Sequence, residues 1–99
     1  MLHLVRHSPH GDSRFASWLR VVAPGQDVVL IEDAVYALLP GTAQHQSLSL
    51  LPANIRIHAL ESDLLGRGLA LDALPGRVWV IDYPRLVELC VEHEKVVSW

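Results

Sequence analysis

The chain has 99 residues, of which 51% are hydrophobic and 19% charged, and its formal net charge is −3 at pH 7. This length supports one hydrophobic core, so we expect a single domain over residues 1–99, and the scattered arginines form no basic run for direct nucleic-acid binding. No apolar segment reaches the roughly 18–20 residues that span a bilayer, and the amino terminus lacks a signal peptide, which favours a cytoplasmic protein without membrane contact.

Four apolar runs predict strands, because each ends at a polar residue and is followed by a helical pattern. The runs are "MLHLVRHSP" (1–9), "VVLIED" (28–33), "IRIHALESD" (55–63) and "VWVID" (78–82). The segment "VVSW" (96–99) predicts a further short strand. Strands that alternate with helices, and whose interiors are apolar on both faces, indicate a parallel sheet covered on both sides. We therefore expect a three-layer α/β/α fold with about five strands.

The first helix is predicted from the spacing of apolar residues after residue 12. Asp12 and Ser13 form a start signal, and Pro24-Gly25 mark the end. Apolar side chains recur at i, i+3, i+4 and i+7, the spacing of one helix face, so we expect this stripe to be buried. Its members are Phe15, Trp18, Leu19 and Val22.

The middle of the chain predicts shorter helices. Pro40-Gly41 interrupt residues 33–52, which favours two short helical pieces there. Residues 60–68 predict another short helix, with Glu61 or Ser62 near its start.

The last helix is predicted from residue 82 onward. Asp82 is suited to cap it, and Pro84 is suited to its first turn. One face of this helix is apolar and the opposite face is charged. The apolar face consists of Tyr83, Leu86, Val87, Cys90 and Val91, and the charged face of Arg85, Glu88 and Glu92.

Glu32 and Asp33 follow a predicted strand and raise the question of a catalytic carboxylate pair. Such a pair needs two facing acids with separated pKa values, whereas neighbours at a strand end point in different directions. An acid in this position can instead cap the following helix, where its charge suits the positive end of the dipole. We therefore expect Asp33 and Asp82 to be helix caps, and Glu32 and Asp33 to position a helix.

Three histidines near the amino terminus do not predict a metal site. His3, His7 and His10 lack the i, i+4 spacing of ligands on one helix face, and they straddle the end of a strand. We expect no bound metal there.

The other candidates for chemistry lack companions. His45, His58 and His93 have no acidic or nucleophilic partner that the sequence identifies, so we expect each to be exposed or partly buried. Cys90 lies late in its helix within the apolar stripe, where the dipole disfavours a thiolate, so we expect a buried structural thiol. No G-x-G-x-x-G or G-x-x-x-x-G-K-[ST] motif occurs, and we expect no nucleotide cofactor.

Four segments in register resemble the TusB/DsrH family and are closest to its TusB branch. The segments are "MLHLVRHSP" (1–9), "VVLIEDAVYALLPGT" (28–42), "LESDLLGRGL" (60–69) and "VIDYPRLVELCVEHEKVVSW" (80–99). Together they cover nearly the whole chain, and their order, spacing and length fit the family. The resemblance implies a DsrE-like domain with a parallel five-stranded sheet, of flavodoxin-like or Rossmann-like architecture.

The resemblance also implies a subunit of a bacterial sulfur relay. TusB-like proteins assemble with TusC-like and TusD-like paralogues into a dimer of heterotrimers. That complex passes persulfide sulfur from TusA-like towards TusE-like proteins for 2-thiolation of the tRNA wobble uridine. The sulfur-carrying cysteine of the family lies on the TusD-like or DsrE-like partner, so the resemblance implies a non-catalytic chain. We expect no cofactor.

One position separates the branches of the family. DsrH proteins of sulfur oxidisers carry a cysteine on the first helix, in the segment that aligns with "RFASWLRVV" (14–22), where this chain has Trp18. Cys90 matches no functional cysteine of the family. The resemblance therefore supplies no catalytic residue.

The apolar surplus and the resemblance together predict surface that is buried against paralogous chains or, in the isolated chain, in a homodimer. The candidate interface residues are Trp18, Val96, Val97 and Trp99. Core packing is the alternative for Trp18, as it is for Phe15 and Leu19.

Two other functions are open. The chain could be a DsrH-like subunit of a DsrEFH complex in sulfur oxidation, with Cys90 or a histidine taking part in transfer. It could also be a free-standing domain that binds a small ligand in the crevice at the carboxyl ends of the strands, which is where open α/β sheets bind ligands. The residues near that crevice are Ser8, Glu32, Glu61 and Asp82.

Overall fold

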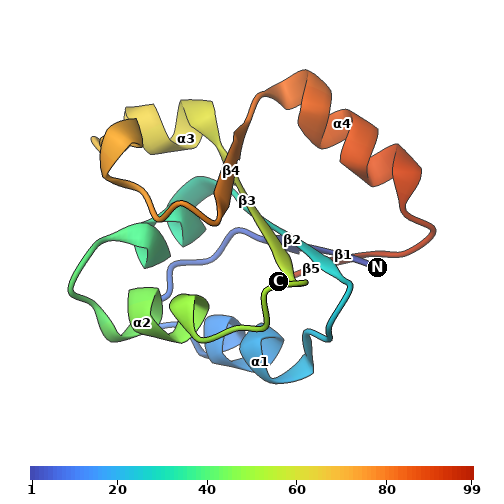
Figure 1. Ribbon diagram of the computed structural model, residues 1–99, viewed down its shortest axis with the longest axis horizontal. Coiled ribbons are helices and arrows are strands. Elements are labelled where there is room, and N and C mark those ends of the chain that lie inside the picture. Colours follow the sequence, from blue (N-terminus) through green and yellow to red (C-terminus); the bar gives the residue numbers. More distant parts are fainter.

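The computed structural model describes residues 1–99 and contains one five-stranded sheet with helices between its strands (Figure 1). The strands are β1 (Leu2–Val5), β2 (Asp27–Leu30), β3 (Arg56–Leu60), β4 (Val78–Ile81) and β5 (Val96–Ser98). The helices are α1 (Ser13–Val21), α2 (Ala43–Ser49), α3 (Glu61–Gly66) and α4 (Tyr83–Glu92), with 3-10 helices η1 (Glu32–Leu38) and η2 (Leu71–Ala73). The predicted strands and helices are confirmed, whereas η2 has no counterpart among them. None of the helices combines the length and the apolar character needed to cross a membrane.

All strand pairs in the sheet are parallel, and the strand order is β4-β3-β2-β1-β5. Strands β1 to β4 are added one after another in one direction, and the chain then returns to place β5 on the other side of β1. Right-handed crossovers put the helix of a reversed connection on the opposite face of the sheet. Figure 1 shows this arrangement, with α1 and α2 on one face and α4 on the other. The predicted three-layer α/β/α fold is confirmed.

The two faces of the sheet have cores of unequal size. Alternate strand residues point to opposite faces, so Val28 and Ile57 join a cluster of 15 buried residues, to which α1, η1, α2 and α3 contribute. Val29 and Leu60 join a cluster of only 5 buried residues, to which α4 contributes Leu89. One helix of 10 residues therefore covers the second face of the sheet.

The ends of the helices follow the capping pattern of the sequence in two of the three predicted places. Asp12 accepts a hydrogen bond from the backbone N–H of Arg14 at 2.9 Å, and Asp82 accepts one from that of Arg85 at 2.9 Å. Both acids occupy N-cap positions, where free N–H groups need acceptors. The start signal at residue 12 and the cap at residue 82 are confirmed.

The predicted cap at Asp33 is wrong. Helix η1 begins directly at Glu32, whose φ is +50°, so Asp33 already lies inside the first turn. Its carboxylate instead accepts a hydrogen bond from Arg67 Nε at 3.0 Å. The free N–H of Glu32 is bound by Asp63, whose Oδ2 accepts at 2.8 Å. The two acids at the end of β2 thus take part in contacts that fix η1 against α3 and the residue that follows it.

The break in the middle segment is confirmed at Pro40-Gly41, between η1 and α2. Gly41 has a φ of +83°, in the left-handed region that glycine adopts without steric cost. The next residue, Thr42, caps α2 by accepting a hydrogen bond from the N–H of His45 at 3.1 Å.

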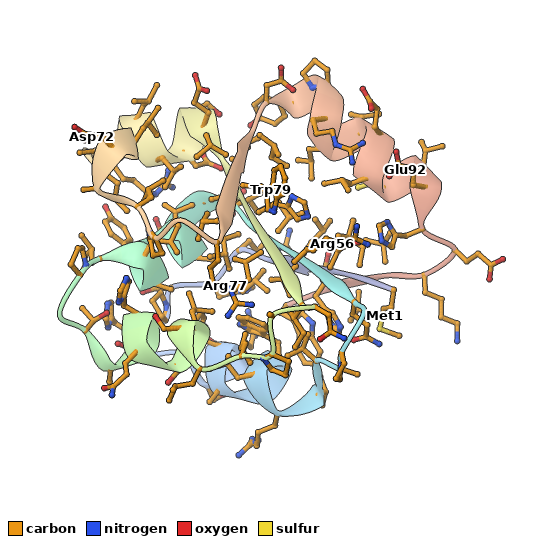
Figure 2. The ribbon with its side chains drawn as sticks, viewed as in Figure 1. Met1, Arg56, Asp72, Arg77, Trp79 and Glu92 are labelled. Carbon is orange, nitrogen blue, oxygen red and sulfur yellow. The ribbon has the colours of Figure 1, made fainter.

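Arg77, labelled in Figure 2, ties the loop before β4 to the end of α2. Its Nη1 donates to the carbonyl oxygens of Leu48 and Leu51 at 3.1 and 2.7 Å. Its Nη2 donates to those of Pro52 and Ile55, both at 2.9 Å. One guanidinium therefore donates to four carbonyl groups, of which those of Leu48 and Pro52 also accept a backbone N–H.

We expect Arg77→Met to lower the free energy of unfolding by about 1–3 kcal/mol, because charge-assisted bonds to these carbonyls are lost. Urea denaturation of the purified chain measures the change. The matched control is Arg20→Met on α1, an exposed arginine without a side-chain hydrogen bond, which should cost less than about 0.5 kcal/mol. Equal losses in the two variants would contradict the structural role of Arg77.

Candidate functional site

A buried ionic cluster lies between the sheet and α4. Its centre is Asp27, the first residue of β2, whose exposed fraction is 3%. Asp27 Oδ1 lies 2.8 Å from Arg56 Nε and 3.6 Å from His58 Nε2, and Oδ2 lies 2.7 Å from His93 Nε2. One carboxylate therefore connects β2, β3 and the end of α4.

The register of the strands explains why these side chains meet. Asp27 pairs with Arg56, and Val29 pairs with His58. Because alternate residues of a strand share a face, Asp27, Arg56 and His58 all lie on the face that α4 covers. His93 is the residue at which α4 ends, and it brings its ring to Asp27.

Both ring nitrogens of His93 face oxygen atoms. Nδ1 lies 2.6 Å from the carbonyl oxygen of Leu89, and Nε2 lies 2.7 Å from Asp27 Oδ2. Carbonyl and carboxylate oxygens accept hydrogen bonds and do not donate them. The ring of His93 therefore connects the last turn of α4 to the first residue of β2.

His58 is the least satisfied polar side chain of the cluster. Its exposed fraction is 6%, and neither of its ring nitrogens has a hydrogen-bond partner. Burial lowers the pKa of His58 below its ordinary value of 6.5, and this effect outweighs the opposing effect of the Asp27 charge. At neutral pH the buried ring is therefore uncharged.

We expect the free energy of unfolding to fall as the pH is lowered below about 6.5, because the unfolded chain then binds a proton at His58 more readily than the folded chain does. The stability is present above the unfolded pKa and is lost towards the lower, folded pKa. His58→Gln should remove this component. Urea denaturation between pH 5.5 and 7.5 compares the variant with the wild type, and His10→Gln, at an exposed position, serves as the control. Identical pH dependence in the wild type and His58→Gln would contradict this assignment.

The cluster lines a pocket of about 230 Å³ that opens beside α4. Figure 2 shows Arg56 on the side of the sheet over which α4 runs, and Glu92 on the helix. Arg85 lies at the rim, where its Nη1 donates to Glu88 and Glu92 at 3.1 and 3.0 Å. The lining residues are Asp27, Arg56, His58, Arg85, Leu89, Glu92 and His93.

A second hollow of about 200 Å³ adjoins this pocket towards the edge strand β4. It shares Arg56, His58 and Arg85 with the first pocket and adds Trp79 and Ile81. The two hollows form one groove, charged beneath the end of α4 and more apolar beside β4.

Comparison with known proteins places the chain in a family. The sequence profile described as "DsrH like protein" matches residues 7–96. The chain is 34% identical over 99 residues to Protein TusB of Escherichia coli (strain K12) and to Protein TusB of Shigella dysenteriae serotype 1, with all of each chain covered. The chain belongs to the DsrH-like family. The resemblance drawn from the four sequence segments is thereby confirmed.

Solved structures share the fold of this DsrH-like chain. The crystal structure of the ychN protein from E. coli has a TM-score of 0.85 and 22% sequence identity, and covers 99% of this chain and 97% of that one. Protein MTH1491 from Methanobacterium thermoautotrophicum has a TM-score of 0.72 and 17% identity, with 99% and 96% covered. At these identities the likeness concerns the fold alone, and it confirms the predicted α/β class.

Trp18, one of the predicted interface residues, is a core residue of the DsrH-like domain. None of its surface is exposed, and its ring packs edge-on against Phe15, with ring centroids 5.3 Å apart. The chain itself covers this side chain, so Trp18 has no surface to offer a partner. The alternative of core packing is confirmed for Trp18 and Phe15, and Leu19 packs against the same cluster.

The other predicted interface residues keep some exposed surface at the β5 edge. Val96 is 41% exposed, whereas Val97 and Trp99 are half-buried. Trp99 also packs within the chain, because its ring stacks on His3 and its Nε1 donates to His3 Nδ1 at 3.1 Å. Contact of Val96, Val97 and Trp99 with a partner stays a prediction.

The prediction of a ligand crevice at the carboxyl ends of the strands is wrong, because no pocket lies there. None of the three pockets of the molecule is lined by Ser8, Glu32, Glu61 or Asp82. Side chains at this end instead contact one another, as Arg67 does Asp33, while Asp63 binds the N–H of Glu32. The charged groove instead lies near the amino-terminal end of β2.

Cys90 is half-buried and packs against the smaller core cluster beneath α4. The histidines near the amino terminus have separate contacts: His3 bonds with Gln26 at 2.8 Å, His7 with Arg14, while His10 is exposed. No group of three or more His, Cys, Asp or Glu side chains is arranged to hold a metal ion.

Sequence patterns did not predict the ionic cluster. The expectation that the His58 side chain is exposed or partly buried is wrong. Asp27 is the first residue of the otherwise apolar strand β2, and His58 lies within β3. A polar residue at an inward position of a buried strand signals an internal partner. Predicting the contacts of Asp27 with His58 and His93 requires knowledge of the strand register and of the path of α4. A local sequence pattern contains neither.

Proposed function

We propose that this chain is a non-catalytic subunit of a TusBCD-like complex that passes persulfide sulfur towards 2-thiolation of the tRNA wobble uridine in the cytoplasm. Its direct partners are TusC-like and TusD-like paralogues, and TusA-like and TusE-like proteins act on the assembled complex. The observation that carries the proposal is the 34% identity to Protein TusB over the whole length of both chains. A relation that covers every element favours a shared role in an assembly.

The uneven covering of the sheet supports a role as a subunit. Tyr83, Val87 and Val91 follow one another at intervals of four residues along α4, and they are 59%, 60% and 79% exposed. Residues at this spacing form one stripe along a helix. Together with Val96 on β5, they give the thinly covered side of the domain apolar surface of the kind found at protein interfaces. The apolar face predicted for α4 is thus only partly buried within the chain.

The surroundings of Cys90 support a non-catalytic role. A reactive thiolate needs a helix amino terminus or a cationic neighbour, and an accessible sulfur. Cys90 lies in the last turn of α4, half-buried against the core. The carboxyl end of a helix carries the negative end of the dipole, which disfavours a thiolate.

Native mass spectrometry of this chain, alone and together with its TusC-like and TusD-like paralogues, tests the proposal. We expect a mass equal to two copies of each of the three chains. Val91→Glu should weaken this assembly, because it puts a charge in the proposed contact. The matched control, Val21→Glu, changes a valine that is 53% exposed on α1, across the sheet from α4, and should assemble normally. A chain that stays apart from both paralogues, alone or as a homodimer, would overturn the proposal.

The match to the family described as "DsrH like protein" favours a second candidate, a DsrH-like subunit of a DsrEFH complex in sulfur oxidation. Trp18 separates the two candidates, because it fills the core where that branch carries a cysteine. The same mass measurement with DsrE-like and DsrF-like chains distinguishes the two sets of partners.

A further inference from the structure

The groove beneath α4 contains more hydrogen-bond donors than its own acceptors use. Arg56 engages Asp27 through Nε and Nη2, and Arg85 engages Glu88 and Glu92 through Nη1 alone. A guanidinium carries five N–H groups in a planar fork, so both arginines retain free donors. His58 adds an N–H that has no partner within the protein.

The charged groups of the pocket are nearly balanced. Arg56 and Arg85 line it, against the carboxylates of Asp27 and Glu92. Arg56 contacts Asp27, and Arg85 contacts Glu92 and also Glu88. Apart from Asp27 Oδ1, the groups left without a partner are N–H donors, and these carry the attraction for a negative ligand.

The size and the position of the pocket point to a small ligand. Its volume of about 230 Å³ lies below the roughly 300–1,000 Å³ that accommodates drug-sized molecules. Only one of its seven lining residues is hydrophobic, so the surface suits a ligand that is polar over most of its area. A buried histidine without partners at the inner wall is an incomplete hydrogen-bonding site that a ligand oxygen can complete.

We infer that this pocket binds a small inorganic oxyanion of the sulfate or phosphate type. Its oxygens accept hydrogen bonds from the free N–H groups of Arg56 and Arg85 at the rim and from the ring N–H of His58 at the inner wall. The guanidinium fork matches the oxygens of such anions in geometry as well as in charge. The inference rests on this chain's own side chains and is independent of the proposed sulfur relay.

Titration of the isolated full-length chain with sodium sulfate tests the site. The ionic strength is held constant with sodium chloride, and the imidazole signals of His58 and His93 are followed by NMR. We expect the signals of both rings to shift as sulfate is added and to reach a plateau at high sulfate concentration. Arg85→Gln should weaken binding by about tenfold, the loss expected for one charge-assisted contact. Arg85→Lys, which keeps the charge, should recover part of the affinity.

The control is Arg20→Gln, which removes the same charge from an exposed position on α1, away from the groove, and should leave sulfate binding unchanged. Backbone spectra show whether each variant is folded. Linear, unsaturated shifts in the wild type would overturn the inference, and so would equal affinity in Arg85→Gln and the wild type. Equal weakening by Arg20→Gln would also overturn it, because attraction would then come from the net charge of the molecule.

Discussion

Replacing Trp18 with alanine is expected to lower the free energy of unfolding by about 3–5 kcal/mol. The indole is fully buried between α1 and the sheet, so its removal combines the loss of buried apolar area with the cost of a cavity. A domain of this size has a total stability of about 5–15 kcal/mol, so the expected loss is a large fraction of that total. Urea denaturation followed by circular dichroism measures the change.

Trp79→Ala is the matched control, because it removes the same side chain from a position on β4 (labelled in Figure 2) that is 63% exposed. This variant should lose less than about 1 kcal/mol in the isolated chain. If both tryptophan variants were equally stable, Trp18 would not be the core residue that the structure describes.

Asp27→Asn is expected to lower the free energy of unfolding by about 3 kcal/mol at pH 7, which is the scale for removing one partner of a buried ion pair. Asparagine has nearly the shape of aspartate but presents N–H groups on one side, so it cannot accept from both Arg56 and His93. Arg56 and the His93 ring are then left without the carboxylate that they contact. Urea denaturation at pH 7 measures the loss.

Asp72→Asn provides the control, since Asp72 is an exposed acid on η2 without an ion pair in the structure (Figure 2). The same change of charge should alter stability by less than about 0.5 kcal/mol there. The NMR signals of the His93 ring should change in Asp27→Asn and stay the same in Asp72→Asn. A stable Asp27→Asn variant with unchanged His93 signals would contradict the ionic cluster.

Local patterns were sufficient to predict most of the fold. The stripe from Phe15 to Val22 specified α1, and the acids at residues 12 and 82 marked helix starts, because caps act within one turn of the residue that makes them. The apolar runs specified the strands, because a strand buried on both faces carries few polar residues. Each of these predictions depends on neighbours within about ten residues.

The ionic cluster could not be predicted in the same way. Asp27 and His93 are separated by 66 residues, and they meet only because the chain reverses after β4 and brings α4 back across the sheet. The error at Asp33 has a related cause. The acceptor for the free N–H at the start of η1 is Asp63, which lies on α3, 31 residues further along the chain.

The position of β5 has a consequence for the synthesis of the protein. Leu2 on β1 pairs with Val96 on β5, so one edge of β1 stays unpaired until residues 96–98 have left the ribosome. An unpaired strand edge is a template for association with other chains. Pairing of β1 with β5 is also slow, because the two strands are far apart in sequence and the chain between them must be ordered first. The nascent chain therefore passes through a period in which this edge of β1 is free to pair with another chain.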